Sequence, residues 1–120
     1  MRTILVADDK ATSRELVRVA LEHCGYLVYE ASDGAEALTS ARSLHPDLII
    51  LDLHMPGLDG FAVIEELRLD ATLAATPVMA LTASAMQGDK ERALSVGFTS
   101  YLAKPIGLSK LREEVARLLR

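Results

Sequence analysis

The sequence has a single cysteine, no cluster of basic residues and no long apolar run. One cysteine excludes a disulfide within the chain, and Cys24 is expected to be a buried thiol on the apolar side of a helix. The 13 basic residues are scattered and the net charge is −4, which argues against direct binding to nucleic acid. No apolar run approaches the roughly 18–20 residues that span a bilayer. We therefore expect a cytoplasmic protein without membrane contact.

Five short apolar runs alternate with five amphipathic stretches, and no linker, repeat or low-complexity segment separates them. The first, third and fourth runs lack the alternation of apolar and polar residues that marks a half-exposed strand, so helices are expected to cover both of their faces. The pattern predicts an α/β fold, a doubly wound (βα)5 parallel five-stranded sheet, in one domain, 1–120. The runs cover residues 4–7, 27–29, 48–51, 78–81 and 101–103.

The helix after the first run has marked ends. Thr12 and Glu15 have the spacing of a capping box, and Gly25 follows as a C-terminal stop. Leu16 and Cys24 are expected on its buried stripe. The residues of this helix expected to face water are Arg14, Glu15, Arg18 and Glu22.

The other helices also carry end signals. The fourth helix is expected over about residues 86–96, because a glycine follows directly. Polar residues that can cap a helix stand before the second, third and fifth apolar stripes. These expected caps are Asp33, Asp59 and Ser109.

Polar residues directly follow four of the five strand runs. Asp8 and Asp9 follow the first run, Asp52 the third, Thr82 the fourth and Lys104 the fifth. Any one of these residues alone would be ordinary loop chemistry. Together they are informative, because the ends of parallel strands gather at one edge of a doubly wound sheet, where such folds bind ligands.

Three carboxylates at one edge need a compensating cation. Two unit charges at about 4 Å repel by roughly 4 kcal/mol at an effective dielectric near 20. Carboxylate oxygens suit Mg²⁺, with Mn²⁺ as an alternative, better than they suit zinc. A carboxylate beside such a cation, the ammonium group of Lys104 and the hydroxyl of Thr82 is equipped to accept a phosphoryl group.

These motifs resemble the receiver domain of two-component response regulators, over essentially the whole chain. The matching segments are Asp8-Asp9, residues 47–60, residues 82–84 and residues 101–105. The likeness is strongest to single-domain cell-division-type receivers and to receivers of hybrid histidine kinases. The resemblance implies a flavodoxin-like sheet with strand order 2-1-3-4-5.

The resemblance also implies roles for the acidic residues. Asp52 matches the phosphoacceptor of a two-component phosphorelay, which takes its phosphoryl group from a phosphohistidine. Asp9 and Asp52 match direct ligands of Mg²⁺, and Asp8 matches a ligand that acts through water. His54 stands where the family supplies a backbone carbonyl to the metal. No enzymatic activity is implied beyond the domain's own phosphotransfer and dephosphorylation.

The remaining matched residues surround the phosphoryl group or respond to it. Thr82, Ala83 and Lys104 match the phosphoryl-binding groups. Thr82 and Tyr101 match a pair that switches on activation. The bond before Pro105 matches one that is cis in the family, against about 5–6% of X-Pro bonds in general.

By the same resemblance, a histidine kinase or histidine phosphotransfer protein is the expected phosphodonor. Thr12, Ser13 and Leu16 are expected to contact it. A downstream protein is expected on the fourth helix, fifth strand and fifth helix, around Tyr101. A phosphorylation-dependent dimer is an open alternative for the output.

Three other interpretations have weaker support. A haloacid-dehalogenase-like phosphatase would need an acid two residues after Asp52, where His54 stands. A flavin-binding module would need a phosphate-cradling loop in place of Asp8 and Asp9. A zinc site from His23, Cys24 and His54 has the wrong spacing. The chain can be a stand-alone receiver, which its start at Met1 favours, or a fragment of a larger response regulator or hybrid histidine kinase.

Overall fold

The computed structural model describes residues 1–83 and 89–120. The expected alternation of strands and helices is confirmed over this part of the chain. The strands are β1 (Thr3–Ala7), β2 (Leu27–Ala31), β3 (Leu48–Asp52), β4 (Val78–Thr82) and β5 (Ser100–Ala103). The helices are α1 (Ala11–Glu22), α2 (Gly34–Leu44), α3 (Gly60–Leu69), α4 (Asp89–Ser95) and α5 (Leu108–Leu118).

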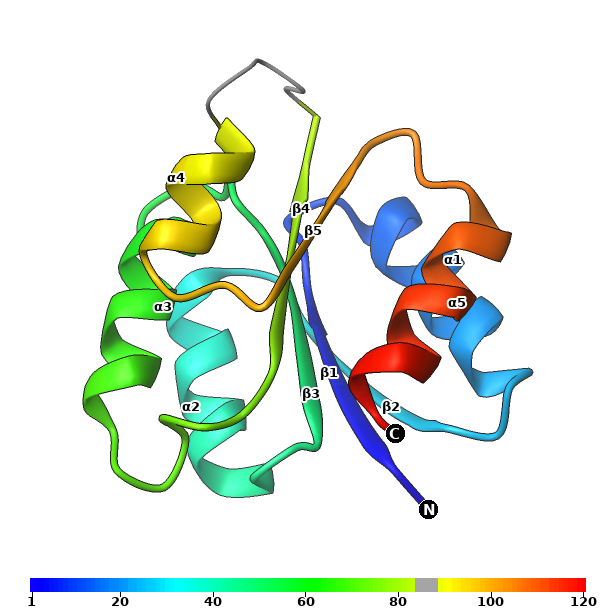
Figure 1. Cartoon of the computed structure of the whole chain (residues 1–120), viewed down its shortest axis with the longest axis horizontal. Helices are drawn as coiled ribbons and strands as arrows, with labels where there is room; N and C mark the ends of the chain where they lie inside the picture. The colour runs from blue at the N-terminus through cyan, green and yellow to red at the C-terminus, as the bar shows by residue number, and fades with distance from the viewer. Residues whose placement is uncertain (84–88) are drawn as a thin grey trace.

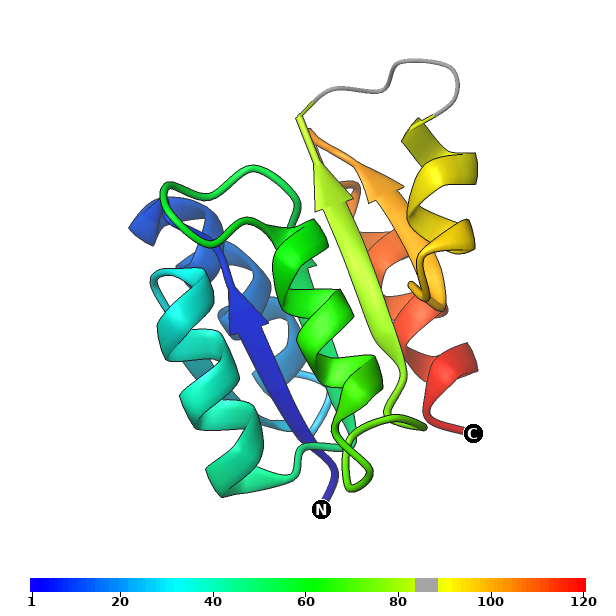
Figure 2. The same ribbon diagram turned by 90° about the vertical axis from the view of Figure 1, so that its left-hand side faces the viewer.

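All five strands are parallel and lie in the order β2-β1-β3-β4-β5, which confirms the predicted fold class. Helices α1 and α5 cover one face of the sheet, and α2, α3 and α4 cover the other (Figure 1). The carboxyl ends of the strands point to one edge, opposite the two chain termini (Figure 2). Side chains that follow the strands therefore meet at that edge.

Each face of the sheet has its own apolar core. The residues of β3 and β4 are all buried, and β1 is buried after its first residue, as their unbroken apolar runs predict. One core lies under α1 and α5, around Val17, Ile50 and Leu111. The other lies under α2, α3 and α4, around Leu51 and Ile64. This packing fixes the strands that carry the polar edge.

The helix starts agree with the sequence in two cases and differ in two. The carboxylates of Asp33 and Asp59 accept N–H groups of α2 and α3, as expected. Helix α1 instead starts at Ala11 and has no side-chain cap, so the predicted capping box at Thr12 is wrong. The Asp8 carboxylate accepts the Lys10 N–H at 2.9 Å and turns the chain into the helix early.

Helix α5 also starts early, with Gly107 rather than Ser109 at its N-cap position. For the fourth helix, the expected start at Met86 lies outside the described residues.

The prediction of a buried Cys24 is wrong, because this thiol is exposed. Helix α1 ends at Glu22, so the chain leaves the helical path before Cys24 can continue the apolar stripe. Leu16 is also exposed, and the buried stripe of α1 consists of Val17, Ala20 and Leu21.

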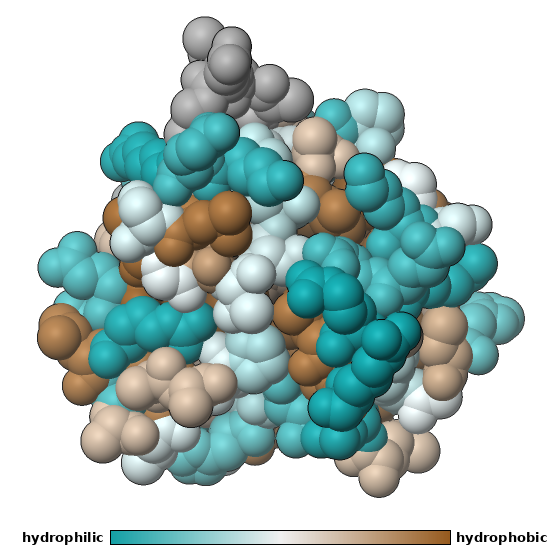
Figure 3. Space-filling model, viewed as in Figure 1, coloured by the Kyte–Doolittle hydropathy of each residue, from teal (hydrophilic) through white to brown (hydrophobic). Residues whose placement is uncertain are grey.

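None of the helices among the described residues is long and apolar enough to cross a membrane. On the face shown in Figure 3, apolar side chains form separate patches interrupted by hydrophilic ones.

Candidate phosphoacceptor site

The strand register brings the predicted site residues level with one another. Ala7 of β1 lies beside Leu51 of β3, so the next residues, Asp8 and Asp52, stand side by side at the end of the sheet. Across β4, the Lys104 N–H donates to the Thr82 carbonyl at 2.7 Å, which holds the start of the following loop against the same edge. The fold therefore gathers the residues that the sequence placed at the strand ends.

Asp8, Asp9 and Asp52 form a cluster of three carboxylates. One oxygen of each lies within 4.8 Å of the others. Asp8 and Asp52 are buried, whereas Asp9 is exposed. A group of hard oxygen donors with one side open to water fits Mg²⁺, which prefers carboxylates and retains several waters. The ligand atoms of the cluster therefore fit Mg²⁺, the metal that the sequence predicts.

The Asp52 carboxylate is contacted at both oxygens. Its Oδ1 accepts the His54 backbone N–H at 3.1 Å, and its Oδ2 accepts from Lys104 Nζ at 3.2 Å. Burial raises the pKa of Asp52; the His54 N–H and the Lys104 charge oppose this effect, and the Asp8 charge adds to it. The structure thus holds a buried carboxylate whose charge is only partly compensated by protein groups.

Lys104 links two of the three acids. Its Nζ lies 2.8 Å from Asp8 Oδ2 and 3.2 Å from Asp52 Oδ2. Burial alone would lower the pKa of Lys104, but the hydrogen bond to Asp8 and the charges of both carboxylates raise it. The Lys104–Pro105 bond is cis, as predicted.

The hydroxyl side of the site lies at the end of β4. Thr82 is fully buried, and Ala83 directly after it is exposed. Tyr101 lies opposite Ala80 in the β4–β5 register, and it packs half-buried against the core under α2, α3 and α4. Because Thr82 is two residues after Ala80, Thr82 and Tyr101 share that face of the sheet.

A glycine lets helix α3 start directly against the end of β3. The Gly60 N–H donates to the Leu53 carbonyl at 3.1 Å. A Cβ atom at Gly60 would lie only 2.8 Å from the Asp52 carbonyl oxygen, which no side chain tolerates. The Asp59-Gly60 pair therefore serves both as a helix cap and as a close-packing point below Asp52.

The predicted docking residues lie beside the site. Ser13 and Leu16 of α1 line a hollow of about 230 Å³ together with Lys104, Pro105 and Ile106. Thr12 is exposed and lines an adjoining hollow with Leu16. An approaching protein could therefore contact α1 and the Lys104 loop together.

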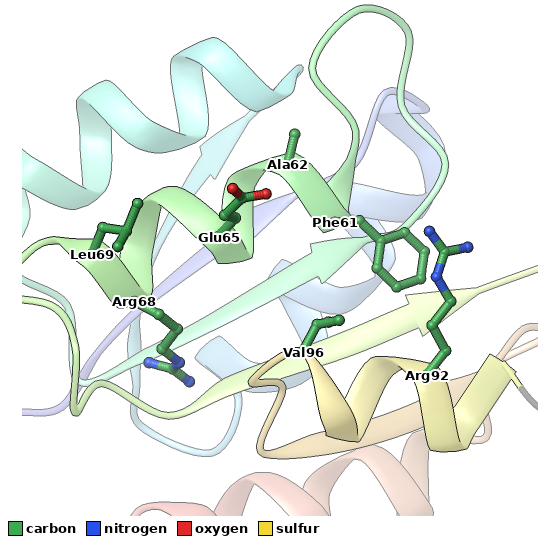
Figure 4. Close-up of a pocket in the computed structure, with 7 residues that line it drawn as sticks. All are labelled: Phe61, Ala62, Glu65, Arg68, Leu69, Arg92 and Val96. Carbon is green, nitrogen blue, oxygen red and sulfur yellow. The ribbon is translucent and has the colours of Figure 1, made fainter.

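A second groove lies away from the acidic cluster. It has a volume of about 560 Å³ between α3 and α4, and none of its lining residues is an expected site residue. Figure 4 shows Phe61 and Arg92 facing one another across it, with the guanidinium carbon 4.0 Å from the ring centroid. Sequence reasoning did not anticipate this groove.

One contact to the acidic loop was missed by the sequence analysis. Arg14 does not face water as expected, because its Nη1 donates to the Asp8 backbone carbonyl at 2.7 Å. Its side chain is only 17% exposed. Sequence reasoning could not find the contact, because the acceptor is a backbone atom that no residue type marks.

The fold and the carboxyl-edge cluster together define a receiver-type signalling domain. The family model described as "Response regulator receiver domain" matches residues 4–116. The chain therefore belongs to the response regulator receiver domain family, as a phosphoacceptor module of two-component signalling.

Relatives of two lengths match the chain. "DNA-binding dual master transcriptional regulator RpaA" of Synechocystis sp. is 41% identical over 100% of this chain and 50% of its own length. "Polar-differentiation response regulator DivK" of Brucella ovis is 36% identical over 98% of this chain and 96% of its own. The chain thus spans about half the length of several curated relatives and nearly all of DivK.

A solved structure with a metal also matches. It is the receiver domain of the sensor histidine kinase PA1611 from Pseudomonas aeruginosa, with a magnesium ion coordinated in its active site cleft. The sequences are 34% identical, the TM-score is 0.90, and the match covers 98% of this chain and 97% of that one.

Proposed function

We propose that Asp52 is the residue on which this receiver domain accepts a phosphoryl group from a phosphohistidine. The observation that carries the proposal is one buried carboxylate held between a lysine and two further carboxylates. The Asp52 carboxylate attacks phosphorus as the P–N bond of the phosphohistidine breaks, and the histidine nitrogen takes up a proton from solvent. The chain catalyses only this transfer and the later hydrolysis of its own acyl phosphate.

Asp9 and Asp52 are proposed to bind Mg²⁺ directly, with Asp8 acting through water and His54 through its carbonyl. The oxygen-rich cluster and the magnesium ion in the PA1611 receiver support this assignment, and Mn²⁺ has the same ligand preference. When bound, the cation neutralises charge on the carboxylates and on the incoming phosphoryl oxygens.

Three groups are proposed to bind the phosphoryl oxygens. Lys104 is already at Asp52 Oδ2, and it can move to a phosphoryl oxygen without leaving Asp8. The Thr82 hydroxyl and the Ala83 N–H are proposed to donate from the end of β4. All three assignments use donors that already stand at the carboxyl edge, where negative charge would develop in the transition state.

The phosphodonor is proposed to be a histidine kinase or histidine phosphotransfer protein that docks on Thr12, Ser13 and Leu16. The hollow that joins α1 to the Lys104 loop supports this surface. The downstream protein is proposed to bind around Tyr101, on α4, β5 and α5. The cytoplasmic location, the phosphorylation-dependent dimer and a role within a longer protein stay predictions.

The phosphoacceptor is tested by intact-protein mass spectrometry after incubation with acetyl phosphate and Mg²⁺. The wild type should gain the mass of one phosphoryl group, and Asp52→Asn should gain none. Chelation of the metal should abolish labelling of the wild type. Asp59→Asn is the matched control, because it removes a nearby carboxylate while asparagine still caps α3. A phosphorylated Asp52→Asn protein would disprove the assignment.

A further inference from the structure

The guanidinium of Arg14 bridges helix α1, strand β2 and the acidic loop. Its Nη1 donates to the Asp8 carbonyl at 2.7 Å, and its Nε donates to Glu30 Oε1 at 3.2 Å. The other Glu30 oxygen forms an ion pair with Arg18 Nε at 2.9 Å. Two arginines one helical turn apart thus share one glutamate, and of these two arginines it is Arg14 that also donates to the Asp8 carbonyl.

The carbonyl that Arg14 binds belongs to the peptide bond between the two adjacent acids. Because a peptide bond is planar, holding the Asp8 carbonyl also fixes the position of the Asp9 Cα atom. The rest of Asp8 is held separately: its N–H donates to the Ala31 carbonyl at 3.1 Å, and its Oδ2 accepts from Lys104. The Arg14 contact therefore helps to set the direction in which the Asp9 carboxylate points into the cluster.

We propose that Arg14 is a positioning residue for the Mg²⁺ site, acting through the Asp8–Asp9 peptide plane. The inference rests on the proposed function, because it needs Asp9 to be a metal ligand. Glu30 contributes by holding the guanidinium at Nε, so that Nη1 stays aimed at the carbonyl. Groups that orient metal ligands typically change metal affinity by about 10–100-fold when they are removed.

Arg18 provides a matched control on the same helix. Both arginines pair with Glu30, and both are partly exposed, at 17% for Arg14 and 30% for Arg18. A role limited to anchoring α1 on β2 would therefore be shared by the two residues. A role in the metal site would belong to Arg14 and not to Arg18.

The test is Mg²⁺ titration by calorimetry of wild type, Arg14→Gln, Arg14→Lys, Arg18→Gln and Asp9→Ala, with a thermal melt of each metal-free protein. Arg14→Gln should weaken Mg²⁺ binding about tenfold, and Arg18→Gln less than about twofold. Arg14→Lys should fall between, because an ammonium group cannot match the fixed fork of the guanidinium. If Arg14→Gln does not fold, Arg14→Lys carries the comparison with Arg18→Gln.

Three results would overturn the inference. Equal weakening by Arg14→Gln and Arg18→Gln would reduce Arg14 to a helix anchor. Unchanged affinity in Arg14→Gln, with strong loss in Asp9→Ala, would remove Arg14 and leave the proposed function intact. Unchanged Mg²⁺ affinity in Asp9→Ala would show that Asp9 is not a metal ligand, and both the proposed metal site and the inference about Arg14 would then be wrong.

Discussion

A half-buried cationic side chain lies at each of the two ends of the sheet of this receiver domain. The two side chains differ in the groups that accept their hydrogen bonds. At the carboxyl end, Lys104 donates to the carboxylates of Asp8 and Asp52. At the amino end, Arg68 donates to neutral backbone carbonyls. Its Nε and Nη2 bind the Gly97 carbonyl at 3.0 and 2.7 Å, and its Nη1 binds the Thr76 carbonyl at 2.7 Å.

The pKa values of the two cations shift in opposite directions. Burial lowers the pKa of Arg68, and carbonyl dipoles do not reverse that effect. Lys104 experiences the same burial effect, but the hydrogen bond to Asp8 and the two negative charges raise its pKa overall. The carboxyl end is therefore a balance of full charges that a metal ion or phosphoryl group can change. At the amino end, the hydrogen bonds of Arg68 go to neutral carbonyls of separate segments, which they join to α3.

Arg68 joins α3 to the two segments that lead into β4 and β5. Figure 4 shows it extending from the end of α3. Gly97 suits this contact in two ways: its φ of +118° is one that side-chain-bearing residues rarely adopt, and a Cβ there would lie 3.1 Å from the Arg68 side chain. This close packing explains why a residue outside the phosphoacceptor site should matter for folding.

The largest expected effect on stability comes from breaking the amino end. Arg68→Met should lower the free energy of unfolding by about 2–4 kcal/mol, because several carbonyls lose a shared donor. Urea denaturation measures this change. Labelling of the folded variant by acetyl phosphate should stay at the wild-type level.

Arg42→Met is the control for that experiment. Arg42 is 50% exposed and pairs with Glu66 and Asp70 at 3.6 Å, so its loss should change stability by less than about 1 kcal/mol. Equal losses in the two variants would show that the amino end has no special role. Loss of labelling in folded Arg68→Met would show that the amino end also affects phosphoryl acceptance at the carboxyl end.

A smaller effect is expected from Asp52→Asn at the carboxyl end, in the absence of metal. The folded protein raises the pKa of Asp52, so it binds the proton more tightly than the unfolded chain does. Stability contributed by protonated Asp52 is therefore lost as the pH rises from about 4 through the raised pKa. Asp52→Asn should be more stable than wild type at neutral pH, by about 1 kcal/mol, and this advantage should shrink toward pH 4.

Urea denaturation of both proteins in chelator, from pH 4 to pH 7.5, measures this difference. Added Mg²⁺ should stabilise the wild type and reduce the gap, because it compensates the charge of the cluster. A variant less stable than wild type at neutral pH would mean that the ion pair with Lys104 outweighs the burial of Asp52.

The two ends also differ in how far the sequence predicts them. At the carboxyl end, the sequence predicts the positions of Asp8, Asp52 and Lys104, because strand ends can be read from apolar runs and these residues follow them directly. The sequence does not predict the contacts of Arg68 and Arg14, because both side chains bind backbone carbonyls, which no residue type marks. The sequence also predicts the helix starts at Asp33 and Asp59, because the capping side chain stands next to the helix that it caps.

The smallest expected effect concerns how the carboxyl end influences the surface beyond it. Thr82 and Tyr101 share one face of the sheet, and Tyr101 is only half-buried, so a shift of Thr82 toward the phosphoryl group can alter how deeply the ring packs. The difference in ring burial between the two states sets the coupling, and partial burial of an aromatic amounts to a few kcal/mol at most. The unphosphorylated protein should therefore already populate the inward ring to a minor extent.

Nuclear magnetic resonance with beryllofluoride and Mg²⁺, as a substitute for the phosphoryl group, measures that coupling. Thr82→Ala should still be labelled at Asp52 by acetyl phosphate, but its chemical-shift changes around Tyr101 should be much smaller than those of wild type. Thr82→Ser keeps the hydroxyl and should retain the wild-type response, which separates the hydroxyl from the loss of a methyl group in a buried site. Equal responses in all three proteins would show that Thr82 does not connect the two regions. Absence of any response in wild type would show that Tyr101 only packs against the edge of the sheet, and the carboxyl end would then have to signal through another surface.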